Sequence, residues 1–288
     1  MRTKIVLISA LLSVCALSFA QAPANDPSEW RTLDPQNTLY MELESGRIII
    51  ELAPQFAPNH VDNIRKLVRA TYFDNQRINR VQDNFVAQWG DSSIGKPLRD
   101  AKRTLPAEFM RPAKGLNFTL LPDPDTYAAQ VGFVDGFPAG RESETGQAWA
   151  LHCYGMIGVG RENASDSGGG TELYAVIGHA PRQLDRNITV VGRVVRGMAL
   201  LSSLPRGEGS MGFYQRRDQH TIIKSMRMAA DVPVADREPL EALRTDSKRF
   251  ATQTESRRNN QDEWYKVPAG RLDVCNVPLP VRRSAPRG

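Results

Sequence analysis

The sequence predicts a mainly β protein built around a closed antiparallel barrel, and three observations support this prediction. Short runs in which apolar and polar residues alternate recur along the chain, separated by Gly, Pro, Asn and Asp. Only two or three segments repeat apolar residues at helical spacing. The sequence also has no internal repeat. Many short strands with few helices favour a barrel, because closure removes the unpaired edges of a sheet.

The length and composition fit one large globular domain or two small ones. Of the 288 residues, 41% are hydrophobic and 24% are charged, which excludes collagen, coiled coil and low-complexity disorder as the main architecture. The net charge is +5, and loss of Arg2 and Lys4 with the export signal described below lowers it by two, to +3. So weak an excess, without a dense basic run, predicts no nucleic-acid partner.

The first 22 residues have the three parts of an export signal. Arg2 and Lys4 form a positive start, residues 5–19 are apolar, and Ala20-Gln21-Ala22 is a small-residue cleavage site. The apolar run is shorter than the roughly 20 residues that a membrane helix needs. We therefore expect a signal peptide cleaved after Ala22 and no membrane span in the mature chain. The alternatives are an uncleaved anchor and lipid attachment at Cys15.

A polar lead-in over residues 23–37, which contains three Pro, precedes a predicted hairpin over residues 38–52. We expect the lead-in to be flexible. The alternating strands of the hairpin meet at Ser45-Gly46, a dipeptide that favours a turn. Asn59 then caps a predicted helix, in which apolar residues recur at helical spacing. These residues are Val61, Ile64, Leu67 and Val68.

Two short strands are predicted next, over residues 77–81 and 85–89. From residue 92 to about residue 147 the chain has six Pro, many Gly and no sustained period. This pattern predicts a long loop insertion or lid over 92–147 without a core of its own. The β pattern returns at Ala148. The further predicted elements are strands over 149–159, 173–177, 188–195 and 221–228, and a short helix over 197–204.

Residues 231–288 are a charged C-terminal extension. Pro239 is suited to the first turn of a helix, so we expect a helix from Pro239 through Phe250. The remainder is rich in Pro and ends in several Arg. It is predicted to be a tail that Cys275 holds to the body of the protein.

The mature chain keeps two cysteines, Cys153 and Cys275, because Cys15 leaves with the signal. An even pair in an oxidising compartment favours a disulfide. One buried and one exposed free thiol are the alternative. A metal site is not expected, because two Cys and four scattered His show no ligand spacing.

Common catalytic motifs are missing from the sequence. It contains no P-loop, no zinc-protease helix motif and no nucleophile elbow. Gly158-Val159-Gly160 lacks the third Gly of a dinucleotide site at the required offset. We therefore expect no cofactor.

One unusual segment spans residues 78–91. Arg80 falls within a predicted strand, and Phe85 and Gln88 lie one strand later. A guanidinium, an aromatic ring and a carboxamide on one sheet face would make an apolar slot with fixed hydrogen-bond donors. Spacing alone favours a plainer interpretation: a surface Arg, a core Phe and a solvated Gln.

Residues 78–91 resemble the cyclophilin signature F-H-R-V-x-x-x-F-x-x-Q-G-G-D. The hairpin with its following helix resembles the start of the same fold. Residues 170–176 are similar to the family's G-S-Q-F-F-I strand, and residues 190–198 to V-F-G-x-V-x-x-G-M. The matching blocks cover roughly 38–91 and 149–228. Because the motifs occur in order with consistent gaps, the chain resembles a cyclophilin-type peptidyl-prolyl cis/trans isomerase with an insertion and a C-terminal extension.

The resemblance implies a closed eight-stranded antiparallel barrel capped by two helices, over residues 38–230. It also implies peptidyl-prolyl cis/trans isomerase activity (EC 5.2.1.8) without a cofactor. In the family the signature Arg donates a hydrogen bond to the prolyl nitrogen, a role that carries over to Arg80. Phe85 would wall the proline pocket, and Gln88 would hold the substrate backbone. By the same alignment the further substrate-binding residues are Glu172, Tyr174 and Ile188.

The sequence departs from the family at several pocket positions. Tyr174 replaces a Phe, which adds a hydroxyl to the ring, and Glu172 replaces a Gln. The family's Trp is missing near Gln183. Its pocket His is missing near Asn187, where Ile188 would supply an apolar wall instead. Because the indole N–H of that Trp normally contacts cyclosporin, we expect this protein to resist the ligand.

The export signal and the resemblance together lead us to expect an exported, monomeric isomerase that acts on proline-containing polypeptides in a bacterial periplasm. Asn187-Ile188-Thr189 is an N-glycosylation sequon beside the expected pocket, where a glycan would obstruct the site, and this favours a bacterial host. A non-catalytic peptide-binding or chaperone module on the same fold is the alternative, and the missing pocket residues favour it. A hydrolase with its site in residues 92–147 is a third possibility, which no motif supports.

Overall fold

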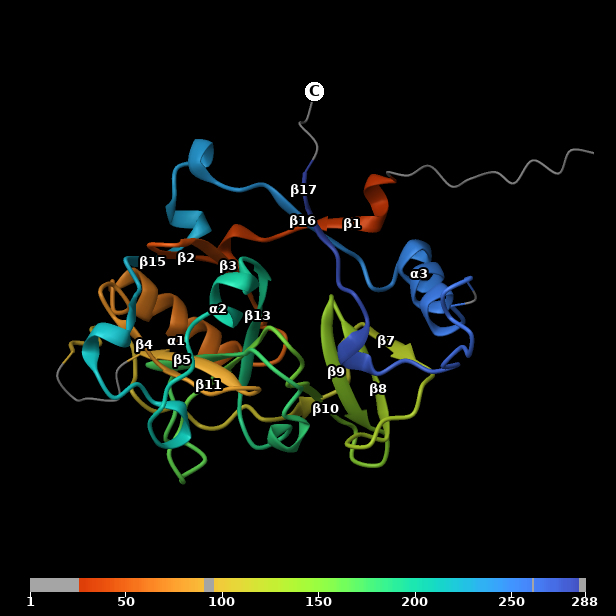
Figure 1. The fold of residues 1–288 in the computed structure, drawn as a ribbon, viewed down its shortest axis with the longest axis horizontal. Helices are drawn as coiled ribbons and strands as arrows, with labels where there is room; N and C mark the ends of the chain where they lie inside the picture. Colours follow the sequence, from red (N-terminus) through yellow and green to blue (C-terminus); the bar gives the residue numbers. More distant parts are fainter. Residues whose placement is uncertain (1–25, 91–95, 261, 285–288) are drawn as a thin grey trace, which may run out of the picture.

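The computed structural model describes residues 26–90, 96–260 and 262–284. The signal peptide predicted for residues 1–22 lies outside the described residues. Within these ranges the chain forms a nine-stranded main sheet, a five-stranded accessory sheet and a three-stranded terminal sheet. Figure 1 shows the main sheet at the left, the accessory sheet at the right and the terminal sheet above both. None of the helices in the described ranges combines the length and apolar character needed to cross a bilayer.

The main sheet contains the predicted hairpin and, next to each other, the two predicted short strands. Its strand order is β14-β4-β5-β12-β11-β13-β3-β2-β15, and each neighbouring pair is antiparallel. The strands are β2 (Thr38–Leu43), β3 (Gly46–Leu52), β4 (Arg77–Val81), β5 (Val86–Gly90), β11 (Met156–Val159), β12 (Glu172–Val176), β13 (Val190–Arg196), β14 (Thr221–Ile222) and β15 (Ser225–Met228).

The expectation of a closed eight-stranded barrel is wrong, because the main sheet is an open half-barrel of nine strands. The single strand expected over 221–228 is divided into β14 and β15. Between them, the amide of Ile223 donates to the carbonyl of Gln76, and the amide of Lys224 donates to the carbonyl of Glu42. The segment therefore changes its pairing partner from β4 to β2, and the two edge strands are joined by the chain rather than by a ladder.

Helix α1 (Pro58–Arg69) covers the concave core of the main sheet, as its apolar spacing predicts. Pro58 occupies its first position, where a missing N–H leaves no hydrogen bond unmade. The prediction that Asn59 caps the helix is wrong, because the N-cap is Ala57 and Asn59 lies inside the first turn. The four apolar residues named for this helix are all buried in the main-sheet core. The second predicted helix is present as α2 (Met198–Ser202), which begins after Gly197. Gly197 has φ of 82°, and a side chain there would also collide with the backbone at Arg47.

The accessory sheet contradicts the expectation that residues 92–147 lack a core. Its strand order is β6-β10-β9-β8-β7, and Phe133, Phe137 and Trp149 are buried within it. Gly140 lies under the Trp149 ring, and a Cβ at Gly140 would sit 2.8 Å from that ring. Because Gly140 occupies a position that faces the core, the alternation of apolar and polar residues is not visible in the sequence of this strand. The strands are β6 (Arg111–Pro112), β7 (Phe118–Leu121), β8 (Gln130–Val134), β9 (Phe137–Glu142) and β10 (Gln147–Ala150).

The predicted strand over 149–159 is also corrected. Its first residues belong to β10 of the accessory sheet, and its last residues belong to β11 of the main sheet. The intervening segment contains Gly155, whose φ of 80° ends the extended conformation. The segment from residue 149 to residue 159 therefore passes from the accessory sheet to the main sheet.

The terminal sheet joins the two ends of the described chain. It consists of β1 (Trp30–Thr32), β16 (Leu240–Leu243) and β17 (Val281–Arg283), with β16 in the centre. The lead-in over 23–37 was expected to be flexible, but its residues 30–32 pair with β16. The helix expected over 239–250 is wrong. A strand occupies its first half, and helix α3 (Lys248–Arg258) begins later, capped by Ser247.

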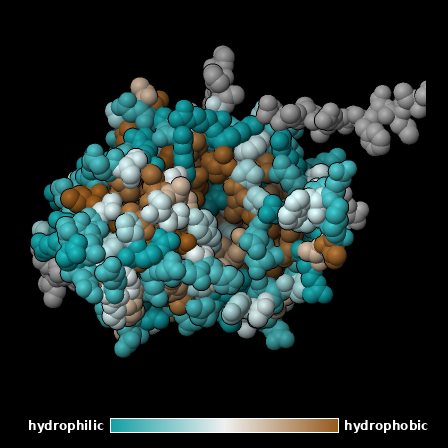
Figure 2. All heavy atoms as spheres, viewed as in Figure 1, coloured by the Kyte–Doolittle hydropathy of each residue, from teal (hydrophilic) through white to brown (hydrophobic). Residues whose placement is uncertain are grey.

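A disulfide joins Cys153 and Cys275, as predicted, with the two Cα atoms 5.0 Å apart. Cys153 lies between β10 and β11, and Cys275 lies in a short 3₁₀ helix of the C-terminal extension. Both pack in one apolar cluster with Phe250 and Val277. On the face shown in Figure 2, apolar side chains gather between the main-sheet and accessory-sheet parts of the molecule. The accessory sheet and the extension therefore share a core.

Candidate active site

Arg80 on β4 lies directly opposite Gln88 on β5. Opposite residues of paired strands share a sheet face, so their side chains meet. Between Ile78 and Arg80 the register shifts by one residue. This bulge leaves Ile78 in the core, paired with Trp89, and turns Arg80 to the outer face. The local irregularity is what places a guanidinium beside the carboxamide.

The Arg80 guanidinium is held from several directions, and the residue is only 8% exposed. Nε–H donates to the carbonyl of Met211 at 2.7 Å, and Nη1 donates to Oε1 of Gln88 at 2.9 Å. Nη2 donates to the side-chain oxygen of Gln82. A guanidinium has five N–H donors, and bonds to other described residues account for one donor on Nε and one on each Nη.

Two aromatic rings flank the same guanidinium. The Cζ atom of Arg80 lies 5.6 Å from the centroid of Phe85 and 5.4 Å from that of Phe213. Burial lowers the pKa of Arg80 below its ordinary value, while the neighbouring Tyr174 and Glu172 act in the opposite direction. An Arg remains charged at physiological pH under such conditions. The site therefore presents a fixed positive charge beside apolar rings.

Gln88 connects Arg80 to Glu172 of β12. Its Oε1 accepts from Arg80, and its Nε2 donates to Oε2 of Glu172 at 3.1 Å. These two contacts fix which end of the carboxamide faces which neighbour. Gly160 lies against the Glu172 side chain. A Cβ on Gly160 would lie 3.0 Å from the Cβ of Glu172, which is a tight contact.

Tyr174 pairs directly with Gln88 across β12 and β5 and is 5% exposed. Its ring belongs to an apolar cluster with Val86 and Val176, against which Phe85 and Ile188 pack. Its hydroxyl lies 3.0 Å from Nε2 of His152. Burial raises the pKa of Tyr174 above its ordinary value of 10.0, so the hydroxyl stays protonated. The six residues singled out from the sequence are thus brought to one region of the main sheet.

A segment that is not among the predicted site residues, residues 211–213, also contacts Arg80. Met211 and Phe213 belong to a connection between α2 and β14 that had no apolar period. Phe213 forms an isolated backbone bridge with Arg80. A Cβ on Gly212 would lie 2.5 Å from the backbone of Gln82, so only Gly permits this approach. The recurring Gly at 207, 209 and 212 was the available signal.

Among the described residues, no group of three or more His, Cys, Asp or Glu is arranged to hold a metal ion. A sequence model of the family described as "Cyclophilin type peptidyl-prolyl cis-trans isomerase/CLD" matches residues 38–230, well over half of the chain. The chain belongs to this family. A cyclophilin-type isomerase acts on proline-containing peptides, and the protein is a peptidyl-prolyl cis-trans isomerase.

This cyclophilin is similar in sequence to two proteins that are named as peptidyl-prolyl cis-trans isomerases. A "Probable peptidyl-prolyl cis-trans isomerase" of Brucella suis biovar 1 (strain 1330) is 28% identical over 195 residues, which cover 67% of this chain and 83% of the relative. The "Peptidyl-prolyl cis-trans isomerase CYP23" of Arabidopsis thaliana is 26% identical over 200 residues, which cover 69% of this chain and 71% of the relative.

The crystal structure of cyclophilin AquaCyp293 from Hirschia baltica resembles this cyclophilin with a TM-score of 0.71 and 29% identity. The match covers 90% of this chain and 96% of that chain. Since the family match ends at residue 230, the likeness in structure extends to residues outside the family domain.

Proposed function

We propose that Arg80 accelerates X–Pro isomerisation by hydrogen bonding to the prolyl nitrogen, and that the clients are exported proteins. Rotation about an X–Pro bond meets a barrier near 20 kcal/mol, because the amide nitrogen shares its lone pair with the carbonyl. A donor aimed at that nitrogen stabilises the pyramidal form, which exists only in the transition state. Such differential binding needs neither a covalent step nor a cofactor.

The observation that carries this proposal is the guanidinium of Arg80, fixed by three hydrogen bonds that use one of the two donors on each Nη within the described part of the chain. A donor whose direction is set before the substrate arrives costs no reorganisation during the reaction. The adjoining cluster of Phe85, Tyr174 and Ile188 offers an apolar wall for a proline ring. Gln88 and Glu172 lie beside it as polar groups for the substrate backbone.

Export to a periplasm is supported by the signal pattern that ends at Ala22 and by the disulfide of Cys153 and Cys275. Disulfides persist in oxidising compartments. The check is the intact mass of protein expressed in a bacterial host and recovered from its periplasm. A mature chain that begins at Pro23 is expected. An unprocessed chain that stays in the cytoplasm contradicts the export proposal.

The test of the mechanism is a coupled isomerisation assay on an Ala-Pro peptide. Arg80→Ala is expected to lower kcat/KM by at least about tenfold, which corresponds to about 1.4 kcal/mol of transition-state stabilisation. Arg80→Lys keeps the charge but loses the planar fork, so it should recover little activity. Arg77→Ala is the matched control, since Arg77 lies on the same strand. Unaltered turnover in folded Arg80→Ala contradicts the mechanism, and an inactive wild-type protein favours a peptide-binding module.

A further inference from the structure

A buried chain of polar groups runs from the Tyr174 hydroxyl toward the accessory sheet. His152, which is 0% exposed, faces Tyr174 with Nε2 and faces Oδ1 of Asp185 with Nδ1 at 2.9 Å. A carboxylate only accepts, so Nδ1 carries the hydrogen. In the neutral imidazole Nε2 then accepts from the Tyr174 hydroxyl. The backbone amide of His152 donates to the same Asp185 oxygen at 2.9 Å.

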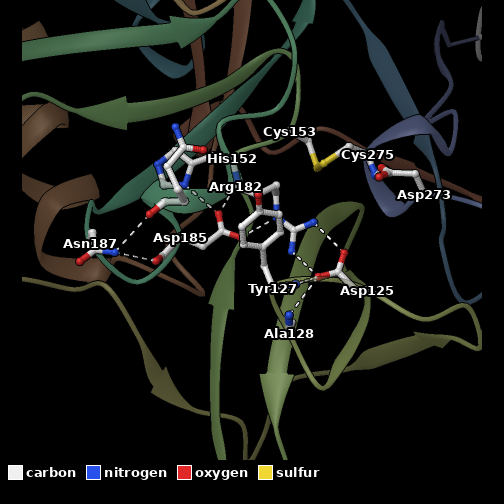
Figure 3. A network of polar contacts seen from close by, with 11 residues as sticks. Asp125, Tyr127, Ala128, His152, Cys153, Arg182, Asp185, Asn187, Asp273 and Cys275 are labelled. Carbon is white, nitrogen blue, oxygen red and sulfur yellow. Dashed lines mark hydrogen bonds and ion pairs between the residues drawn. A yellow bond between two sulfur atoms is a disulfide. The ribbon is translucent and has the colours of Figure 1, made fainter.

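Arg182 continues the chain into the accessory sheet. Its Nε donates to Oδ2 of Asp185 at 2.6 Å, and its two Nη groups donate to the two oxygens of Asp125 at 2.8 Å each. Figure 3 shows Arg182 between these two carboxylates, with His152 beyond Asp185. Asp125 belongs to the connection between β7 and β8 and also accepts from the amides of Tyr127 and Ala128.

The Asp125–Arg182 pair is held firmly although it lines a cleft of about 720 Å³. Both side chains are less than a tenth exposed. Burial by itself raises the pKa of Asp125, but the hydrogen bonds from Arg182 and the two backbone amides hold that pKa below its ordinary value. A bidentate Arg–carboxylate contact also fixes direction, because both groups are planar forks.

The Tyr174 ring, at the other end of this series of hydrogen bonds, is held in one position by its neighbours. A Cβ on Gly158 would lie 2.2 Å from the Tyr174 oxygen, so the missing side chain of Gly158 is the space that the hydroxyl occupies. The hydrogen bond to His152 then sets the ring in that space. Since Phe85 and Ile188 pack against the cluster to which this ring belongs, the position of the ring helps to set the shape of the apolar wall.

We propose that Asp125 is a positioning residue for isomerisation: through Arg182, Asp185 and His152 it holds the Tyr174 wall of the proline pocket. The proposal rests on the substrate-binding role proposed above for Tyr174. It gives the accessory sheet a part in catalysis, since the sheet supplies the outer carboxylate of the chain. Asp125 itself is not a catalytic residue.

The experiment compares Asp125→Asn with Asp123→Asn. Asp123 lies in the same connection and is also a buried partner of an Arg, but it binds Arg258 and the amide of Leu272 in the C-terminal extension. Both variants should lose similar thermal stability. Asp125→Asn is expected to raise KM for the Ala-Pro peptide about threefold or more with a smaller change in kcat, whereas Asp123→Asn should leave both close to wild type.

A double-mutant cycle with Tyr174→Phe separates positioning from general destabilisation. Tyr174→Phe removes the hydroxyl that ends the chain, so Asp125→Asn should cause no further change in kcat/KM in that background. An unchanged KM in Asp125→Asn, or a full additional loss in the double variant, overturns the proposal. If Asp125→Asn does not fold, Asp125→Glu takes its place in the same cycle. Failure of the Arg80 mechanism shows independently, as normal turnover in Arg80→Ala.

Discussion

Glu51 and Arg193 face each other across β3 and β13, and both are buried. Nε and Nη2 of Arg193 donate to Oε2 of Glu51 at 3.0 Å each, and Arg31 of β1 donates to the other carboxylate oxygen at 2.5 Å. Burial by itself raises the pKa of Glu51, but the two guanidinium groups hold it below its ordinary value. One carboxylate thus links the terminal sheet to the main sheet.

Removing that carboxylate charge should destabilise the whole protein. Glu51→Gln leaves the buried Arg193 and the partly buried Arg31 without the charge of Glu51, and should cost about 3–5 kcal/mol of unfolding free energy. Denaturant unfolding measures it. Glu44→Gln is the control, because the pair of Glu44 and Lys224 is largely exposed and should be worth about 0–1 kcal/mol. A loss in Glu51→Gln no larger than in the control would show that the buried pair contributes little.

Stability should decline in acid, in a window set by carboxylates with lowered pKa. They include Glu51 and Glu108, with an ordinary value of 4.5, and Asp123 and Asp125, with an ordinary value of 3.8. A carboxyl group with a depressed pKa in the folded state binds protons more readily when unfolded. Its contribution is therefore complete above the ordinary value and is lost as pH falls through the folded value.

Melting temperatures measured between pH 7 and pH 3 test this expectation. The Tm should decline slightly below about pH 6.5, because burial lowers the pKa of His220 in the folded state, and should fall more steeply below about pH 5 as the carboxylates titrate. Asp125→Asn should flatten the acid part of the curve, because one of the titrating groups is gone. A Tm that holds or rises toward pH 3 is incompatible with the lowered pKa values.

The disulfide should add measurably to stability, because its ends are 122 residues apart. The chain-entropy estimate for closing such a loop is about 4–5 kcal/mol, as an upper guide. Cys153→Ser/Cys275→Ser should therefore melt at a lower temperature, and wild-type protein should lose the same amount on reduction. Alkylation without reductant, followed by intact-mass measurement, should add nothing. Two alkylated thiols in protein from the oxidising compartment would refute the bridge.

Resistance to cyclosporin is the remaining prediction. Gln183 is exposed on a 3₁₀ turn (Arg182–Leu184), at the place where the resemblance expects an indole. Loss of one buried hydrogen bond and its ring packing should cost about 1–3 kcal/mol, or 5- to 150-fold in affinity. Titration of the isomerase activity measures this, and Gln183→Trp should strengthen inhibition. Nanomolar inhibition of the wild type, or no gain from Gln183→Trp, would show that the alignment misplaces the pocket wall.

Local sequence patterns were sufficient to predict much of the main sheet and the helix that covers it. The alternation around Ser45-Gly46 predicted β2 and β3, and the helical spacing after Asn59 predicted α1, because each pattern depends only on near neighbours facing one core. The disulfide also followed from a count of two cysteines. Ordered motifs were enough to name the residues around Arg80, since each motif is contiguous in the chain.

Long-range contacts decided the rest. The accessory sheet escaped prediction because Gly140 lies against Trp149, so this face of the sheet shows no apolar period. Strand β16 was mistaken for a helix because its pairing partners, β1 and β17, come from the two ends of the described chain.

The sequence by itself therefore determined the family, the hairpin, the first helix and the residue types of the candidate site, since these depend on contiguous residues. Only the tertiary structure decided how the site is held. The Met211 carbonyl that orients Arg80 is 131 residues away, and Asp125 meets Arg182 across 57 residues. A hydrogen bond between such distant residues leaves no period in the sequence, because folding rather than chain proximity brings its donor and acceptor together.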